Sequence, residues 1–303
     1  MRSALYLAAL ALLSGAVASA ATPPLRVTGT VRVGGQPTSL APGAGWLWVA
    51  NYGDGSLAWI DPRRARLGGR LMLHESPYGV AFGAEAVWVT SFSTSTVLRV
   101  DPRRKRVVAR IDVGAPEMAG LTATRDAVWV AIFGSGIVAR IDPATNRVVA
   151  RIPVGGKPED AVVYGGAVWV PNEDGTVARI DPARNGVVAR IRVGADPDDA
   201  LACGGLIWTT SLRGPSLVAV DPRTNRVASR VRVGVGSAGL ACTRSLLTAN
   251  YNTNELLRID RSSGRVTGRT DTGVQPRALA LANGSVWVAN QLSGTVSRVA
   301  GGS

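Results

Sequence analysis

The segment GGKPEDAVVYGGAVWVPNEDGTVARIDPARNGVVARIRV, residues 155–193, contains four short apolar runs separated by Gly, Pro, Asn and Asp. The runs cover residues 161–163, 168–170, 177–180 and 187–193. In the fourth run, arginines alternate with Ile191 and Val193, which is the period of a half-buried strand. Turn residues at each boundary complete the pattern of an antiparallel meander. The segment therefore predicts one small four-stranded sheet.

The same unit recurs along the chain with a period of 39 to 41 residues. A Trp marks the second run of six units, and a Leu takes its place in the remaining one: Trp48, Trp88, Trp129, Trp169, Trp208, Leu247 and Trp287. An Asp marks the end of the third run, followed by Pro in five of six cases: Asp61, Asp101, Asp142, Asp181, Asp221 and Asp260. Repeated four-stranded units of this length are typical of β-propeller blades. Seven copies predict an all-β, seven-bladed β-propeller of four-stranded antiparallel blades.

The two ends of the repeat array predict how the ring closes. The seventh unit, 273–299, stops after three strands, and residues 25–33 match the fourth-strand pattern of the other units. We therefore expect the N-terminal strand to complete the last blade, which removes open sheet edges. The expected blades lie near 34–73, 74–113, 114–154, 155–193, 194–233, 234–272, and 273–299 plus 25–33, within a propeller domain of residues 25–303.

Segments such as LWVANYGDGSLAWIDP (47–62) and VWVANQLSGTVSRV (286–299) resemble YVTN-type propeller repeats. Among enzymes, the pattern is similar to that of virginiamycin B lyase, another seven-bladed propeller. The resemblance covers essentially the whole chain after residue 24. It implies the fold, and it implies a Mg²⁺-assisted elimination on a cyclic depsipeptide antibiotic with a His as base. The lyase histidines are not matched, because the one His of this chain, His74, lies in the second unit.

The first residues predict export. A positive start at Arg2, an apolar run over 4–17 and the small residues 18–20 are typical of a signal peptide cleaved after residue 20, with a linker over 21–24. We expect the mature protein to be periplasmic or secreted, not membrane-spanning, and monomeric.

Composition excludes several function classes. Two Cys and one His are too few for a zinc finger or a histidine-rich metal enzyme, and the 36 Gly have no three-residue period, which excludes collagen. The formal net charge is 34 − 21 = +13.

Candidate binding residues lie where the units differ. The loops that precede the first strand and those that join the second and third strands should share one face around the central channel, here called the upper face. The candidate ligand-binding residues in these loops are Tyr52, Tyr78, Glu159, Asp160, Glu173, Asp198, Asp199, Tyr251 and Arg277. No residue is assigned a catalytic role, and no cofactor is required.

Four carboxylates of the upper face are expected to come together. Glu159 and Asp160 occupy the positions in the fourth unit that Asp198 and Asp199 occupy in the fifth. Such a set of oxygen ligands suits Ca²⁺ or Mg²⁺. Unpaired, the set should raise at least one carboxyl pKa. The alternative is a solvated acidic rim with sodium counter-ions.

The two cysteines occupy equivalent places in adjacent units. Cys203 and Cys242 each lie five residues before the Trp position, on the expected innermost strands. An exported protein meets an oxidising compartment. A disulfide is expected if the two Cα atoms come within about 7 Å, and two free thiols are the alternative.

The Trp position is expected to be structural, since each ring should pack against the next blade. Trp59 differs, because it stands where other units have Arg99, Arg140 and Arg179, and we expect it to be more exposed.

Arginines are concentrated away from the upper face. They cluster in the turns before the fourth strands, and one recurs on six outermost strands: Arg70, Arg110, Arg151, Arg190, Arg230 and Arg269. A basic rim can hold an anionic polymer or nucleic acid, or protect sheet edges. We interpret the protein as a non-catalytic binding module for a protein, peptide or glycan ligand in the cell envelope. A virginiamycin B lyase-like enzyme and a binder of anionic polymers are the alternatives.

Overall fold

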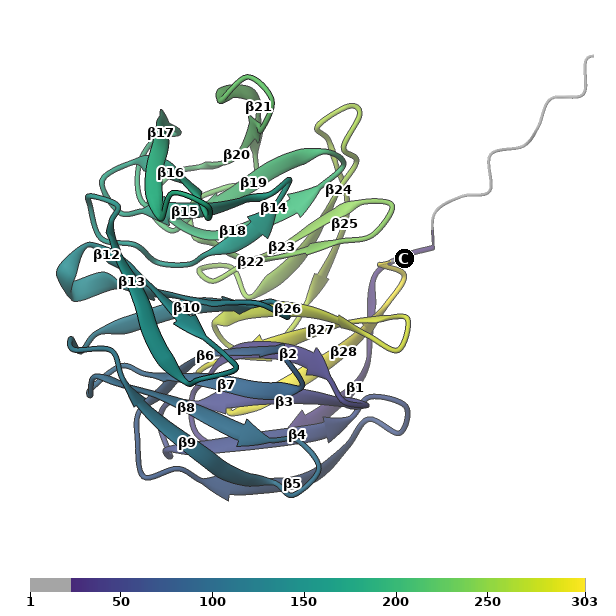
Figure 1. The fold of residues 1–303 in the computed structure, drawn as a ribbon. Coiled ribbons are helices and arrows are strands. Elements are labelled where there is room, and N and C mark those ends of the chain that lie inside the picture. Colours follow the sequence, from purple (N-terminus) through teal and green to yellow (C-terminus); the bar gives the residue numbers. More distant parts are fainter. Residues whose placement is uncertain (1–22, 303) are drawn as a thin grey trace, which may run out of the picture.

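A computed structural model describes residues 23–302 and arranges them in seven four-stranded antiparallel sheets (Figure 1). The fold class predicted from the repeats is confirmed. The predicted signal peptide and the first half of the predicted linker, residues 1–22, lie outside the described residues.

Each of the first six blades runs from an innermost to an outermost strand in chain order. Blade 1 contains β2 (Pro37–Gly43), β3 (Trp46–Asn51), β4 (Ser56–Asp61) and β5 (Arg66–Met72). Blade 2 contains β6 (Pro77–Gly83), β7 (Ala86–Ser91), β8 (Thr96–Asp101) and β9 (Arg106–Asp112). Blade 3 contains β10 (Met118–Ala123), β11 (Val128–Ile132), β12 (Ile137–Asp142) and β13 (Arg147–Pro153), with a 3-10 turn, η1, at Phe133–Ser135.

The later blades repeat this order. Blade 4 contains β14 (Val162–Tyr164), β15 (Ala167–Asn172), β16 (Thr176–Asp181) and β17 (Gly186–Arg192). Blade 5 contains β18 (Pro197–Cys203), β19 (Leu206–Ser211), β20 (Ser216–Asp221) and β21 (Arg226–Arg232). Blade 6 contains β22 (Ser237–Cys242), β23 (Leu246–Asn250), β24 (Glu255–Ile259) and β25 (Val266–Asp271).

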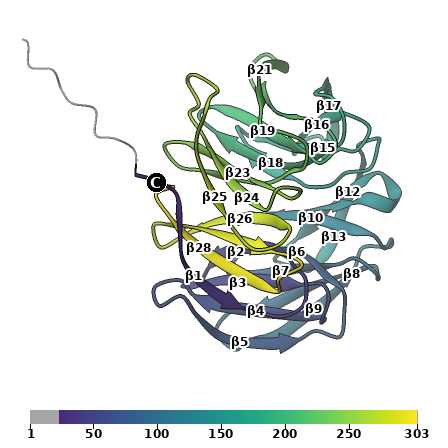
Figure 2. The ribbon, with the colours of Figure 1, turned by 180° about the vertical axis from the view of Figure 1, so that it is seen from behind.

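Blade 7 is built from both ends of the chain. Its strands are β26 (Pro276–Ala282), β27 (Ser285–Asn290), β28 (Thr295–Ala300) and the N-terminal β1 (Arg26–Arg32), which pairs antiparallel with β28. Both views of the ribbon show these two strands side by side (Figure 2). Neighbouring inner strands contact one another around the ring, and β26 contacts β2. The N-terminal strand therefore closes the ring, as predicted.

The tryptophans tie each blade together and to its neighbour. The ring of Trp48 is fully buried among residues of blades 1 and 2, and that of Trp88 among residues of blades 2 and 3. Five of the indole N–H groups donate to the last residue of their own inner strand or its neighbouring turn, as Trp48 Nε1 does to Gly43 O at 3.0 Å. The buried Trp rings thus pack with Val, Leu, Ile and Ala side chains to form the core between neighbouring sheets.

The loops expected on the upper face do share it. The N–H of Tyr52 donates to Gln36 O, and that of Glu173 donates to Lys157 O, so the loop after each second strand is joined to the loop before the inner strand. Within residues 23–302, no helix is long and apolar enough to cross a membrane.

Candidate functional site

The inner strands are irregular where they begin, and this irregularity places the site. In six blades the register between the inner and second strands shifts within the first four residues. In blade 4 the strand is interrupted altogether: Pro158 forms an isolated bridge to Asn172, and β14 begins only at Val162. Bulges of this kind re-aim side chains and are common beside binding sites.

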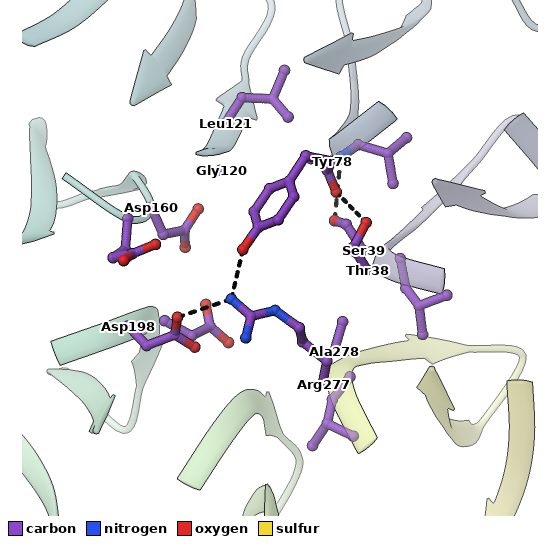
Figure 3. Close-up of a pocket in the computed structure, with 15 residues that line it drawn as sticks. Thr38, Ser39, Tyr78, Gly120, Leu121, Asp160, Asp198, Arg277 and Ala278 are labelled. Atoms are coloured by element: carbon purple, nitrogen blue, oxygen red, sulfur yellow. Dashed lines mark hydrogen bonds and ion pairs between the residues drawn. The ribbon is translucent and has the colours of Figure 1, made fainter. Parts of the chain in front are cut away.

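Two positions in each bulge supply the channel. The residue after the Pro, Met or Ser that starts the bulge is the first channel position: Thr38, Tyr78, Ala119, Glu159, Asp198, Ala238 and Arg277. The next residue is the second channel position: Ser39, Gly79, Gly120, Asp160, Asp199, Gly239 and Ala278. Residues of both positions line one cavity of about 200 Å³ in the channel (Figure 3), all of them except Ala119, Ala238 and Gly239.

Arg277 crosses this cavity. Its Nη2 donates to Tyr78 Oη at 2.7 Å and to Asp198 Oδ1 at 3.2 Å, so one guanidinium joins blades 7, 2 and 5 (Figure 3). The Arg277 and Asp198 side chains are only 17% and 9% exposed, so water screens their attraction weakly. The Asp198 carboxylate holds the pKa of Arg277 above its ordinary value. Burial raises the pKa of Tyr78 to about 12, so its hydroxyl stays protonated at neutral pH.

Asp160 and Asp199, at the second position, form a separate pair. Their carboxyl groups hydrogen-bond to each other. Burial raises the pKa of Asp160 well above its ordinary value, and the Asp199 charge adds to this. Burial also raises the pKa of Asp199, to about 6. Two carboxyls in contact share one proton because both cannot ionise; Asp160 is the member that keeps it.

The second position holds neighbouring blades together. Asp199 Oδ2 accepts the Leu240 N–H of blade 6 at 2.8 Å, and Ser39 Oγ accepts the Val80 N–H of blade 2 at 3.2 Å. Asp160 accepts the N–H of Ala200 in blade 5. These acceptors satisfy bulge N–H groups that the interrupted ladders leave unpaired. Asp160 and Asp199 thus have structural partners on the next blade.

Glu159, at the first position, is the carboxylate left available. Among residues 23–302, its side chain has neither a hydrogen-bond donor nor an ion-pair partner within bonding distance. Its backbone is fixed on both sides, since its N–H donates to Pro171 O and its carbonyl accepts from Gly120 N. Burial, and then the Asp198 charge, raise the pKa of Glu159 to about 8; the positive charge of Arg277 opposes this rise, and Asp196 and Glu173 add smaller repulsions.

An aromatic cluster flanks the cavity. The rings of Tyr52, Tyr78 and Phe92 lie with centroids 5.4 to 6.3 Å apart, two of the pairs edge to face. Tyr78 belongs to both the cluster and the cavity, and Tyr52 is 37% exposed. The upper mouth of the channel therefore has an apolar wall on blades 1 and 2 and an acidic wall on blades 4 and 5.

The remaining candidates lie outside the cavity. Glu173 ion-pairs with Lys157 at 3.4 Å and with Arg213 at 3.5 Å, beside a groove between blades 4 and 5. Tyr251, on the blade 6 loop, lines no part of the cavity. His74 is exposed on the loop before β6 and also lies outside it.

The four carboxylates predicted as metal ligands are not assembled into one set. Across the part of the chain that the structure describes, no three or more His, Cys, Asp or Glu side chains are arranged to hold a metal ion. The physical reason is that Asp160 and Asp199 bond each other and backbone N–H groups, while Asp198 pairs with Arg277. The four carboxylates are therefore not arranged as a ligand set for the Mg²⁺ that the lyase resemblance implies, and binding of Ca²⁺ or Mg²⁺ elsewhere or after rearrangement stays an untested prediction.

A disulfide joins Cys203 of β18 and Cys242 of β22, with a Cα–Cα distance of 5.7 Å. The inner strands of blades 5 and 6 therefore approach closely enough for the bond, which links the two blades at the strand ends opposite the cavity-lining bulges.

Comparisons with known proteins support the fold. No family model matches the chain, and no curated protein sequence matches it. Virginiamycin B lyase from Staphylococcus aureus is 10% identical and superposes with a TM-score of 0.79, over 91% of this chain and 99% of the lyase chain. The two proteins share one fold. Hydrazine synthase from Kuenenia stuttgartiensis is 16% identical, with a TM-score of 0.78 over 88% of this chain and 95% of that chain.

Sequence analysis missed that the two channel positions have different roles: the first supplies the cavity residues Tyr78, Glu159, Asp198 and Arg277, and the second mainly contacts the next blade. Blades with Gly at the second position are crowded there: a Cβ added to Gly239 would lie 2.7 Å from Arg277 O. The succession Ser, Gly, Gly, Asp, Asp, Gly, Ala carried the signal, because small residues at an inter-blade contact indicate packing and not ligand binding.

Proposed function

We propose that this protein is an exported, non-catalytic binding propeller whose channel mouth takes a cationic group, such as the ammonium or guanidinium of a basic peptide or an amine-bearing glycan. The observation that carries the proposal is Glu159, a carboxylate held in a polar cavity without a cationic partner among the described residues. Asp198, Asp196 and Glu173 add negative charge around it, and Arg277 is the one opposing charge among these neighbours, so a further cation should be favoured.

The size of the cavity sets the size of the ligand group. About 200 Å³ is below the roughly 300–1,000 Å³ typical of pockets for drug-sized molecules. One side chain or one small amine fits this volume better than a large ring system. The aromatic cluster of Tyr52, Tyr78 and Phe92 then supplies a wall for the apolar part of the ligand.

Matched small probes test the proposal. N-acetyl-lysine amide and N-acetyl-arginine amide should raise the melting temperature saturably, whereas the neutral N-acetyl-norleucine amide should not. Glu159→Gln keeps the shape and removes the charge, and should abolish the shift. An equal shift with the neutral probe, or an unchanged response in Glu159→Gln, would contradict the assignment of Glu159 as the counter-ion.

A lyase is the second candidate, and the raised pKa of Glu159 favours it. A carboxylate whose pKa lies near the working pH is suited to removing a proton. Glu159 lines the same cavity as Tyr78 and Arg277. In such an elimination, Glu159 would take a proton from carbon while a C–O bond breaks. Linearisation of a streptogramin B substrate without change of mass, lost in Glu159→Gln, would support this function over binding alone.

Binding of an anionic polymer by the basic rim has less support. Several rim arginines pair with nearby acids, as Arg64 does with Asp61 at 3.3 Å and Arg110 does with Glu75 at 2.6 Å. Local pairing lowers the charge that remains for a polymer. A binding constant for a single-stranded oligonucleotide that falls steeply with salt would favour this alternative.

A further inference from the structure

In blades 2, 3 and 4, an arginine joins its own blade to the next. The guanidinium of Arg99 lies over the Trp88 ring, with 5.2 Å between Cζ and the ring centroid. Its Nη1 donates to Pro143 O at 2.7 Å and to Asn146 Oδ1 at 2.8 Å in blade 3. Arg140 and Arg179 make the same pair of hydrogen bonds to the blades that follow them. Each cation therefore has one aromatic face and two acceptors.

Blade 1 departs from this arrangement. Trp59 stands in place of the arginine, and Lys105 of blade 2 stands in place of the asparagine. The Lys105 Nζ lies 4.2 Å from the Trp48 centroid, 4.6 Å from that of Trp46 and 5.1 Å from that of Trp59. Three indole rings thus surround one ammonium, a set that we call the tryptophan cage.

The neighbouring sequence makes room for this cage. The outer strand of blade 1 has Gly68 and Gly69, where blades 2 to 4 have Val and Ala. A Cβ at Gly68 would lie 2.5 Å from atoms of both Trp46 and Trp59, and one at Gly69 would lie 2.5 Å from Trp59. Trp46 itself stands where the other blades have Ala, Leu or Ser. Several departures from the repeat in one place therefore build one site.

The resident ammonium fits the cage poorly. Lys105 Nζ is buried and has no hydrogen-bond partner in the described chain, although an ammonium carries three donors. Burial accordingly lowers the pKa of Lys105 to about 8. A quaternary ammonium needs no hydrogen bonds and is the group that aromatic cages recognise. Trp46 and Trp59 are partly exposed, and the turn that carries Lys105 lies at the surface, so the lysine can withdraw without unfolding the blade.

We propose that the tryptophan cage of Trp46, Trp48 and Trp59 is a binding site for a quaternary ammonium group, closed in the free protein by Lys105 as a displaceable internal ligand. The group is of the trimethylammonium type found in choline headgroups and in trimethylated lysine. This site lies on the outer part of blades 1 and 2 and is independent of Glu159 and the channel.

Tetramethylammonium chloride is the first probe, with sodium chloride at equal concentration as the ionic control. Binding is followed by tryptophan fluorescence and by calorimetry on the whole protein. Lys105→Gly should bind the probe about tenfold more tightly than the wild type, since it no longer competes for the rings. Asn146→Gly is the matched control, because Asn146 occupies the same left-handed turn position in blade 3, with φ 57° against 54° for Lys105. It should behave as the wild type does.

Two results would overturn the proposal. If the wild type shows no saturable binding, Lys105 is a fixed structural contact between blades 1 and 2 and not a displaceable ligand, whatever the Lys105→Gly variant does. Equal affinity of the wild type and Lys105→Gly would place the probe elsewhere, and Trp59→Leu should abolish binding if the cage is the site. Phosphatidylcholine vesicles and a trimethyl-lysine peptide, compared with free choline, then distinguish a lipid source from a protein source of the group.

Discussion

Arg277 Nη2 lies 3.2 Å from Asp198 Oδ1, although the two residues belong to blades 7 and 5. Blade 6 stands between them and has only Ala238 and Gly239 at its two channel positions, neither of which lines the cavity. These small residues leave the space through which the arginine reaches. The mouth of the channel is asymmetric for this reason, with the ion pair on one side and the aromatic cluster on the other.

Removing this arginine should destabilise the protein strongly. Arg277→Ala leaves the buried Asp198 carboxylate unpaired, and losing one partner of a buried pair costs roughly 3 kcal/mol. The double variant Arg277→Ala with Asp198→Asn should regain part of the loss. Urea unfolding measures both. Arg213→Ala is the control: its side chain is 73% exposed, so its pairs with Asp196 and Glu173 should each contribute less than about 1 kcal/mol. Equal losses for the two arginines would contradict this view of the channel.

The Asp160–Asp199 pair predicts unequal losses of stability for two similar substitutions. Asp160→Asn resembles the protonated acid, because its amide can still donate to Asp199, so stability at pH 8 should change by less than about 1 kcal/mol. Asp199→Asn removes an acceptor from the N–H groups of Ala200 and Leu240, which both point at this carboxylate at 2.8 Å. It should cost about 1–3 kcal/mol. Equal effects of the two variants would show that the proton is not held by Asp160.

The sequence predicts the ring well and the site only in part. The Trp position and the Asp-Pro turns recur in nearly every unit. A contact that repeats in this way can be predicted from the sequence of a single unit. Arg277 bonds across the channel to Asp198 and Tyr78, which are 79 and 199 residues away in the sequence, and no local pattern predicts these bonds. The equivalence of Asp160 with Asp199 was visible, but their partners on the following blade are defined by bulges that periodicity does not reveal. Trp59 stood out because it departs from the repeat. Lys105 did not, because the tryptophan rings that surround its ammonium belong to blade 1 while Lys105 belongs to blade 2.

Stability should fall as pH rises from about 5 to 8. Glu159 and Asp199 have raised pKa values in the folded state, about 8 and about 6. The folded protein therefore binds protons that the unfolded chain has already released, and its stability falls as pH rises through this range; Asp160, which keeps its proton, adds to the fall. Glu159→Gln should flatten the upper part of this dependence, measured as melting temperature against pH. The turn carboxylates Asp61 and Asp101 have lowered pKa values and affect stability only below about pH 4.

The same titration should govern binding of the cationic probes. A cation beside Glu159 favours its ionised form, so binding below pH 8 releases a proton and the affinity should rise with pH by up to about tenfold per unit. Calorimetry in two buffers of different ionisation enthalpy measures the proton release. An affinity that is independent of pH between 6 and 8 would argue against Glu159 as the partner of the cation.

The disulfide should contribute measurably to stability. It closes a loop of 39 residues between Cys203 and Cys242, for which the chain-entropy estimate is about 4 kcal/mol. A reductant should lower the unfolding midpoint of the wild type by a corresponding amount. The Cys203→Ala, Cys242→Ala variant should unfold at the lower midpoint and should not respond to reductant, which separates the effect of the bond from that of the reagent.

Ring closure should depend on β1. This strand pairs with β28 from Arg26 to Arg32, and it is the outermost strand of blade 7. Deleting residues 25–33 would expose the edge of β28 and also remove Val31 and Val33 from the core between blades 7 and 1. An unpaired edge invites association with other chains, so we expect a lower melting temperature and concentration-dependent aggregation. Arg258→Ala is a milder test of the same joint, because Arg258 Nη1 donates to both Pro23 O and Gly301 O, at 2.6 and 2.7 Å, and so ties the two terminal segments together. Normal thermal stability of the deletion variant would refute closure by this strand.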